Sequence, residues 1–370
     1  MSKLKLAGLL LFLFLFSLSC KKKTEKEPIA ESNATTESKT FTNPLFPEVG
    51  PDPWAIFQDG KYYYMHTMKD SLVLWVTEDI TNVKNGVKKT IWLPTDPSNS
   101  KDLWAPEIHF INNKWYVYYA ADDGNTDNHQ MYVLENSNRN PLDGNFVMKG
   151  RISTDKDNNW AIDGSVFEQK GNLYMVWSGW QKRRVKEETQ CIYIAKMENP
   201  WTLSSDRVLI SKPELEWETI WKNEKGWTPS YPIFVNEGPQ PLLSPNGKYV
   251  HIVYSASGCW TPYYALGMLS AQTGSDLLNP KSWTKSPKPV FSQSSKNSAY
   301  GTGHNSFFKS PDGKEDYILY HARVTEVDPE GEGDRRTPRM QKFSWTSDGF
   351  PVFGEPVSLT DVLPKPSGTK

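Results

Sequence analysis

Short apolar runs separated by turn residues dominate the chain from Pro44 onward, and no long stretch keeps apolar side chains at helical spacing. Runs of this length, rich in aromatic and branched residues, are typical of β-strands. Several pairs of runs flank a dipeptide such as Asp59-Gly60 or Asn246-Gly247. These dipeptides favour hairpins, because the tight turns between antiparallel strands need a positive φ. The pattern therefore predicts an all-β fold.

One unit recurs along this region: a charged or imidazole side chain, a short apolar strand, a tight turn and a Tyr/Trp-rich strand. The leading residues are Asp52, Glu107, Asp163, Glu237 and His304, at spacings of 55, 56, 74 and 67 residues. Self-similarity at such a period is typical of repeated architectures. Because each unit also holds further strand sequence, we predict a five-bladed β-propeller. A β-sandwich explains the hairpins but not the recurring leading residues.

The innermost strand of each propeller blade runs beside the central axis, so the five leading residues are expected to meet at one opening. Two Asp, two Glu and one His would then share one pocket. Nearby carboxylates repel one another, which raises the pKa of one of them. Acid-base chemistry needs this separation, with one carboxylate ionised as base and another protonated as acid. The constellation therefore predicts hydrolysis of a glycoside.

The N-terminal segment has the pattern of a secretion signal. Lys3 and Lys5 precede an apolar run over 6–16, which is too short to span a membrane as a helix. Small Ser19 directly before Cys20 resembles the end of a bacterial lipoprotein signal, in which the cysteine is lipidated. Ordinary cleavage near Ser19 is the alternative, and it leaves a free thiol. We expect lipidation of Cys20.

This interpretation divides the chain into three parts. We expect a signal peptide over 1–19, a lipidated cysteine and flexible linker over 20–43, and a single catalytic propeller domain over 44–365. The linker is polar and carries almost no large apolar side chain, as a tether requires. The expected location is the bacterial cell envelope, with the lipid anchor as the contact with the membrane.

The balance of charged residues limits the classes of binding partner that we expect. Lys and Arg number 42 against 43 Asp and Glu, so the formal net charge of −1 gives no electrostatic reason to expect nucleic acid. The expected partner is an oligosaccharide or polysaccharide substrate, and the oligomeric state is open. Three cysteines cannot build a disulfide framework, and whether Cys191 and Cys259 are buried or paired is also open.

From about residue 44 to its end, the chain resembles glycoside hydrolase family 43, five-bladed propeller enzymes that act on arabinans, arabinoxylans and related polymers. The resemblance rests on five short motifs that occur in order, one per unit. They are Pro51-Asp52-Pro53-Trp54, Trp104-Ala105-Pro106-Glu107, Ala161-Ile162-Asp163-Gly164, Asn236-Glu237-Gly238-Pro239 and Gly303-His304-Asn305-Ser306-Phe307.

The resemblance implies an inverting hydrolase that needs no cofactor. It implies Asp52 as the general base, Glu237 as the general acid and Asp163 as the residue that tunes and orients that acid. Base and acid in inverting enzymes stand about 6.5–9.5 Å apart to admit a water molecule. A nearby Asp163 charge would raise the pKa of Glu237 by like-charge repulsion.

Further residues are expected around the substrate. His304 stands where relatives place a ligand for a hydrated axial cation, often calcium, although a lone His is an uncommon calcium ligand. Aromatic side chains beside the leading residues are expected as sugar platforms, with Glu107 close to them. These are Trp54 and Trp104, followed by Trp180 and Trp260.

Arg339 resembles the late-blade arginine that reaches the sugar subsite in relatives, and an exposed surface arginine is the alternative. The closer likeness of two segments, 255–262 and 303–313, is to members that release α-L-arabinofuranose from chain ends. We therefore predict an exo-acting α-L-arabinofuranosidase. An endo-1,5-α-L-arabinanase, a β-xylosidase and a non-catalytic sugar-binding lipoprotein are the alternatives.

Overall fold

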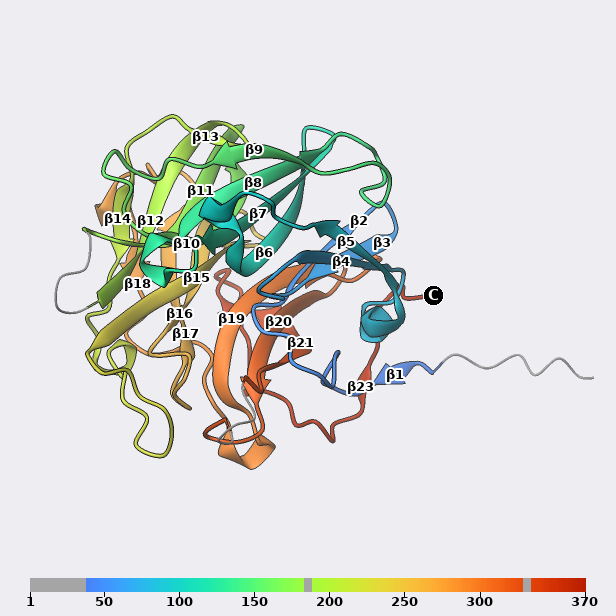
Figure 1. The fold of residues 1–370 in the computed structure, drawn as a ribbon. Coiled ribbons are helices and arrows are strands. Elements are labelled where there is room, and N and C mark those ends of the chain that lie inside the picture. Colours follow the sequence, from blue (N-terminus) through green and yellow to red (C-terminus); the bar gives the residue numbers. More distant parts are fainter. Residues whose placement is uncertain (1–37, 183–187, 329–333) are drawn as a thin grey trace, which may run out of the picture. The chain divides into compact units, whose positions relative to one another are not determined.

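The computed structural model describes residues 38–182, 188–328 and 334–370 and consists largely of β-strands (Figure 1). The predicted signal peptide, Cys20 and the linker up to residue 37 lie outside these residues. No helix in the described ranges is long and apolar enough to cross a membrane.

Five antiparallel blades follow one another along the chain, and we number them I to V. Blade I is β2 (Trp54–Gln58), β3 (Lys61–Met65), β4 (Leu72–Thr77) and β5 (Val87–Trp92). Blade II is β6 (Lys101–Ile111), β7 (Lys114–Asp122), β8 (Gln130–Asn136) and β9 (Val147–Arg151). Blade III is β10 (Ala161–Gln169), β11 (Asn172–Trp180) and β12 (Glu188–Asn199), with β13 (Thr202–Leu203) and β14 (Val208–Ser211) paired to β12. Blade IV is β15 (Ile233–Leu243), β16 (Tyr249–Ala256), β17 (Ala265–Gln272) and β18 (Thr284–Lys285). Blade V is β19 (Tyr300–Lys309), β20 (Asp316–Arg323), β21 (Thr337–Trp345) and β22 (Pro351–Val352).

Helical structure in the described residues is confined to short 3-10 segments between strands. They are η1 (Ile80–Asn85), η2 (Pro97–Asn99), η3 (Thr126–Asn128), η4 (Glu216–Glu218), η5 (Pro280–Ser282) and η6 (Ser295–Asn297). The prediction of an all-β fold is confirmed.

A separate hydrophobic core lies between each pair of neighbouring blades. Four cores join blade I to II, II to III, III to IV and IV to V. A fifth core packs Tyr62 and Tyr64 of β3 against Tyr317 and Leu319 of β20, so the last blade meets the first. This cyclic packing is that of a five-bladed propeller, and it confirms the predicted architecture over the sandwich.

The aromatic second strands follow from this packing. Along β3, Tyr62 and Tyr64 face blade V, whereas Tyr63 and Met65 face blade II. Because both faces of the blade are covered, alternation between polar and apolar side chains gives way to a continuous apolar run. Each buried aromatic ring removes a large apolar area from water, so these strands carry much of the stability of the ring of blades.

Two features complete the ring of blades. Strand β1 (Thr40–Phe41) pairs antiparallel with β23 (Leu363–Pro364), which brings the first and last described strands side by side (Figure 1). Strand β12 also pairs in parallel with the start of β15, which links blades III and IV through main-chain hydrogen bonds.

Cys191 in β12 and Cys259 after β16 are both free thiols, which answers the open question of their pairing.

Candidate active site

All five blades contribute side chains to one cavity of about 380 Å³. Four of the five predicted leading residues line it: Asp52, Asp163, Glu237 and His304. A larger hollow of about 610 Å³ lies over β16 to β18, but its lining contains no carboxylate. Paired carboxylates mark the smaller cavity as the candidate active site.

A backbone feature repeated at every inner strand positions these residues. Asp52, Ala105, Asp163, Gly238 and His304 all have φ between 44° and 57°. In blades II to V the ladder between the first two strands shifts register at this place. Such bulges re-aim side chains and are common beside active sites. The blade II equivalent of Asp52 is therefore Ala105 rather than Glu107.

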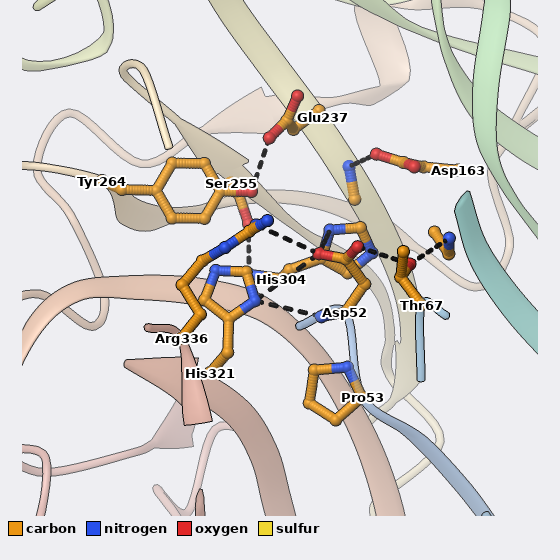
Figure 2. Close-up of polar contacts among 12 residues, drawn as sticks. Asp52, Pro53, Thr67, Asp163, Glu237, Ser255, Tyr264, His304, His321 and Arg336 are labelled. Atoms are coloured by element: carbon orange, nitrogen blue, oxygen red, sulfur yellow. Dashed lines mark hydrogen bonds and ion pairs between the residues drawn. The ribbon is translucent and has the colours of Figure 1, made fainter. Parts of the chain in front are cut away.

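Asp52 is held by donors on both carboxylate oxygens (Figure 2). Thr67 donates its hydroxyl to Oδ2 at 2.7 Å, and the Ala105 N–H donates to the Thr67 hydroxyl at 2.7 Å, which fixes the direction of the Thr67 proton. His304 Nδ1 lies 3.2 Å and Arg336 Nη1 3.4 Å from Oδ1. These contacts hold the Asp52 carboxylate in one orientation at the wall of the cavity.

His321 binds the main chain of Asp52. The main-chain N–H of Asp52 donates to His321 Nδ1 at 3.1 Å, so that nitrogen carries a lone pair and the imidazole is neutral. Burial, and then the positive charge of Arg336, lower the pKa of His321 well below its ordinary value. The neutral ring keeps this acceptor available and holds the Asp52 backbone in its left-handed conformation.

Glu237 has a different environment. It is partly exposed to the cavity, and Tyr264 donates its hydroxyl to Oε1 at 2.7 Å (Figure 2). Burial raises the pKa of Glu237 to about 7, with the Tyr264 hydrogen bond acting in the opposite direction and the Asp52 charge adding to the rise. Near neutral pH, this carboxyl group therefore carries a proton for a large fraction of the time.

Asp163 lies beside Glu237 and contacts the backbone of Gly238, the residue after it. The N–H of Gly238 donates to Asp163 Oδ2 at 2.9 Å. Burial, and then the charge of Glu237, raise the pKa of Asp163 well above its ordinary value. We expected the Asp163 charge to raise the pKa of Glu237, but burial is the main cause of that rise. Because the charges of these two neighbouring carboxyl groups interact, the groups titrate as a pair.

Two residues expected at the substrate lie outside the cavity lining. Trp54 is buried, donates Nε1–H to the carbonyl of Ile108 at 2.8 Å and packs against His109. Glu107 is also buried, where His109 Nε2 lies 2.9 Å from one oxygen and Gln240 donates to the other. Both expectations of substrate contact are therefore corrected, because these side chains complete the interior instead. The sequence pattern placed them beside functional residues but did not reveal their direction.

The expected role of Arg339 at the sugar subsite is also corrected. Arg339 is fully buried and donates to the carbonyl of Ser298 at 3.3 Å, so it is neither a substrate ligand nor the exposed surface arginine of the alternative. Arg336, three residues earlier in the chain, lines the cavity instead. It contacts Asp52 and donates through Nη2 and Nε to Asp334.

His304 does not stand in a recognisable metal site. Within the described ranges, no group of three or more His, Cys, Asp or Glu is arranged to hold a metal ion. The charged neighbours of the His304 ring include the Arg336 guanidinium, which opposes a divalent cation. The carboxylates of Asp52 and Glu107 also act on the ring, and the imidazole contacts Asp52. A hydrated cation at His304 stays a prediction.

The cavity wall adds residues that the motifs did not reveal. Trp104, Trp180 and Trp260 line it as expected of sugar platforms. Sequence reasoning missed Thr67 and Arg336 in this wall. It also missed Tyr264 and His321, which lie outside the lining and contact Glu237 and Asp52. Each of the four acts through a contact that forms only on folding. The remaining wall residues are Lys69, Thr126, Asp127, Trp160, Ile162, Glu188, Gln190, Trp227, Tyr231, Ile233 and Cys259.

Comparison with known proteins agrees with this geometry. The family model described as glycosyl hydrolases family 43 matches residues 41–351. An extracellular exo-alpha-(1->5)-L-arabinofuranosidase of Streptomyces avermitilis is 40% identical over 342 residues, which cover 90% of this chain and 66% of that protein. Alpha-L-arabinofuranosidase 43 of Humicola insolens is 35% identical over 305 residues, which cover 81% of this chain and 60% of that protein. The chain thus spans less than two thirds of the length of both relatives.

A solved structure extends the similarity to three dimensions. The alpha-L-arabinofuranosidase from Lactobacillus brevis superposes with a TM-score of 0.77 at 35% sequence identity. The match covers 87% of this chain and 98% of that one.

Proposed function

Because the chain belongs to glycosyl hydrolases family 43, we propose that it is an inverting, exo-acting α-L-arabinofuranosidase that releases arabinose from arabinan or arabinoxylan oligosaccharides. One observation carries the proposal: two carboxyl groups from different blades, Asp52 and Glu237, line the same cavity in opposite electrostatic environments. Asp52 accepts from Thr67 and lies beside a cation, whereas the pKa of Glu237 is raised to about 7.

Glu237 serves as the general acid. Its raised pKa keeps a proton available near neutral pH, and it delivers that proton to the glycosidic oxygen as the bond to the anomeric carbon breaks. Tyr264 holds one oxygen of the carboxyl group in place. Asp163 accepts the N–H of Gly238, the next residue along the chain, and so orients the backbone that carries the acid.

Asp52 serves as the general base. Its ionised carboxylate takes a proton from a water molecule, and the oxygen of that water attacks the anomeric carbon on the face opposite the leaving group. The product sugar therefore has the inverted configuration. Thr67 and His321 hold the carboxylate and the backbone of Asp52, so the base is positioned before substrate arrives.

Two tests separate this proposal from its alternatives. Proton NMR of the first turnovers on an α-L-arabinofuranoside should show β-L-arabinofuranose before mutarotation, and linear arabinan should yield arabinose as the first product. Internal cleavage of arabinan would indicate an endo-arabinanase, and preferential release of xylose would indicate a β-xylosidase. An absence of turnover with retained sugar binding would indicate a non-catalytic lipoprotein.

Two variants test the catalytic roles proposed for Asp52 and Glu237. Asp52→Asn should lower kcat by about 10²–10⁴-fold, the range typical of a lost general base, and added azide should restore turnover as a β-configured glycosyl azide. Glu237→Gln should be slow on natural linkages but much less impaired on substrates with acidic phenol leaving groups, which need little protonation. Reversal of these two patterns would refute the assigned roles.

We also propose that the protein is a lipid-anchored envelope protein with its catalytic domain over 44–365. Support comes from Ser19-Cys20 at the end of the apolar N-terminal run. Mass spectrometry of the mature N-terminus should find a diacylglyceryl group on Cys20, and a Cys20→Ala variant should leave the membrane fraction.

A further inference from the structure

One tryptophan in the cavity wall differs from the rest in exposure. Trp227 is 67% exposed, while every other tryptophan in the described ranges is buried or partly buried. Exposed indole rings are unfavourable in water, and a large apolar side chain at the rim of a cavity commonly marks a binding surface. The same cavity holds Asp52 and Glu237. The position therefore points to a role in substrate contact.

The packing of Trp227 leaves at least one face of its indole open. It meets Trp260 at a centroid distance of 5.7 Å and an interplanar angle of 84°. In a perpendicular pair, the edge of one ring points at the face of the other, so Trp260 covers no more than one face of Trp227. An open indole face provides an apolar surface for the C–H groups of a sugar ring.

The segment that carries Trp227 is tied down despite its exposure. Trp260 donates Nε1–H to the carbonyl of Trp221 at 2.7 Å, and Asn223 donates Nδ2–H to the carbonyl of Trp260 at 2.8 Å. The N–H of Asn223 donates to the Thr228 hydroxyl at 2.8 Å. These bonds close the loop on both sides of Trp227, so little backbone freedom is lost when a ligand binds.

The same loop reaches across to blade V. Lys225 forms an ion pair with Glu326, and a Cβ added at Gly226 would lie 2.9 Å from Val327 Cγ1. The loop between η4 and β15 thus forms a wall that spans the opening between two blades. In the same cavity Asp163 and His304 are buried and Asp52 and Glu237 are partly buried, so all four are less accessible to solvent than Trp227.

From this arrangement, which rests on the proposed function, we propose that Trp227 is the platform for the sugar on the leaving-group side of the scissile bond. The terminal arabinose enters the closed end beside Asp52, and the next residue of the oligosaccharide stacks on Trp227 near solvent. The site therefore takes a furanose or pyranose ring linked through its hydroxyl to the departing arabinose. A substrate whose leaving group has no ring does not need this contact.

The test compares two substrates. α-L-Arabinofuranosyl fluoride loses a single atom as leaving group, whereas α-(1→5)-arabinotriose presents sugar rings to the platform. We expect Trp227→Ala to lower kcat/KM on arabinotriose about 10-fold, chiefly through KM, which corresponds to about 1.4 kcal/mol. Its kcat/KM on the fluoride should change less than about twofold, and Trp227→Phe should recover most of the activity on arabinotriose.

A matched control is Leu93→Ala, since Leu93 is 66% exposed but lies outside the cavity lining. It should leave both substrates unaffected, and melting curves should show that all variants are folded. Equal loss on both substrates, or no loss on either, would overturn the inference while leaving the proposed activity intact. If the unaltered protein cleaves neither substrate, the proposed function fails first and the inference fails with it.

Discussion

Removal of one hydroxyl group, in the variant Tyr264→Phe, should move the pH dependence of the enzyme to higher pH. Tyr264 donates to Glu237 Oε1 at 2.7 Å, and this bond holds the pKa of Glu237 below the value that burial alone would produce. A hydrogen bond to a charged group contributes about 1.5–3 kcal/mol, and one pKa unit corresponds to about 1.36 kcal/mol. Because Glu237 is partly exposed, we take the lower end and expect a rise of about one unit.

The assay is kcat/KM on an α-L-arabinofuranoside as a function of pH. Its basic limb reports loss of the proton from the acid in the free enzyme, so it should move from about 7 in the parent to about 8 in the variant. The aromatic ring of the variant should keep its place, since the stacking of Tyr264 on His321 does not involve the hydroxyl. Tyr263→Phe is the control, because Tyr263 is 49% exposed and outside the cavity lining. A basic limb that stays at its position or moves to lower pH would refute the reasoning.

Other changes at the site should have distinct effects. The pKa of Glu237 is about 7 in the fold against 4.5 as its ordinary value, so the native state binds more protons between these values and loses stability as pH rises through them. Glu237→Gln should therefore be more stable than the parent at pH 8, with a free energy of unfolding higher by on the order of 1–3 kcal/mol, and should differ little from the parent at pH 4. Melting curves at the two pH values measure this, and an equal gain at both would contradict it. Arg336→Met should lower kcat/KM roughly 100-fold, because Asp52 loses the guanidinium 3.4 Å from its carboxylate. Arg339→Met should leave kcat/KM within about twofold, since Arg339 donates to a main-chain carbonyl away from the cavity. Thr67→Val should lower kcat about 10-fold with KM unchanged, because Asp52 loses its 2.7 Å donor, and a matching rise in KM would point to a binding role instead.

The fold was predictable because its signal is local and repeated. Tight turns such as Asp59-Gly60, flanked by apolar runs, specify hairpins, and recurrence of the hairpin specifies a ring of blades. The alternation of Tyr62 and Tyr63 between two cores also follows from strand geometry alone. The parallel contact between β12 and β15 was not predictable, since neither segment carries a pattern that distinguishes it from other strand edges.

The site was predictable only in part. Four leading residues meet in the cavity because the inner strands begin near a common axis. This meeting could be predicted because each repeated unit carries one leading residue just before its first strand. Glu107 departs from the pattern because the left-handed residue of blade II is Ala105, and the resulting register turns the carboxylate into the interior. Arg339 lies on β21 and Arg336 just before it, three residues apart, so they point to opposite faces of the strand. No sequence pattern states which of the two faces the opening.

The pairing of β1 with β23 sets the manner in which the ring of blades can be opened. Blades I and V each consist of strands that are consecutive in the chain. The junction between them is therefore a seam, held by side-chain packing and by hydrogen bonds such as that from the Leu45 N–H to the Pro338 carbonyl, together with the short β1–β23 ladder. Since Thr40 and Pro364 are direct partners, the ends could be joined covalently and new termini cut elsewhere, for example at the hairpin turn after Asn246. A circularly permuted propeller would then keep every blade, every interblade core and the same catalytic opening, with only the position of the seam exchanged.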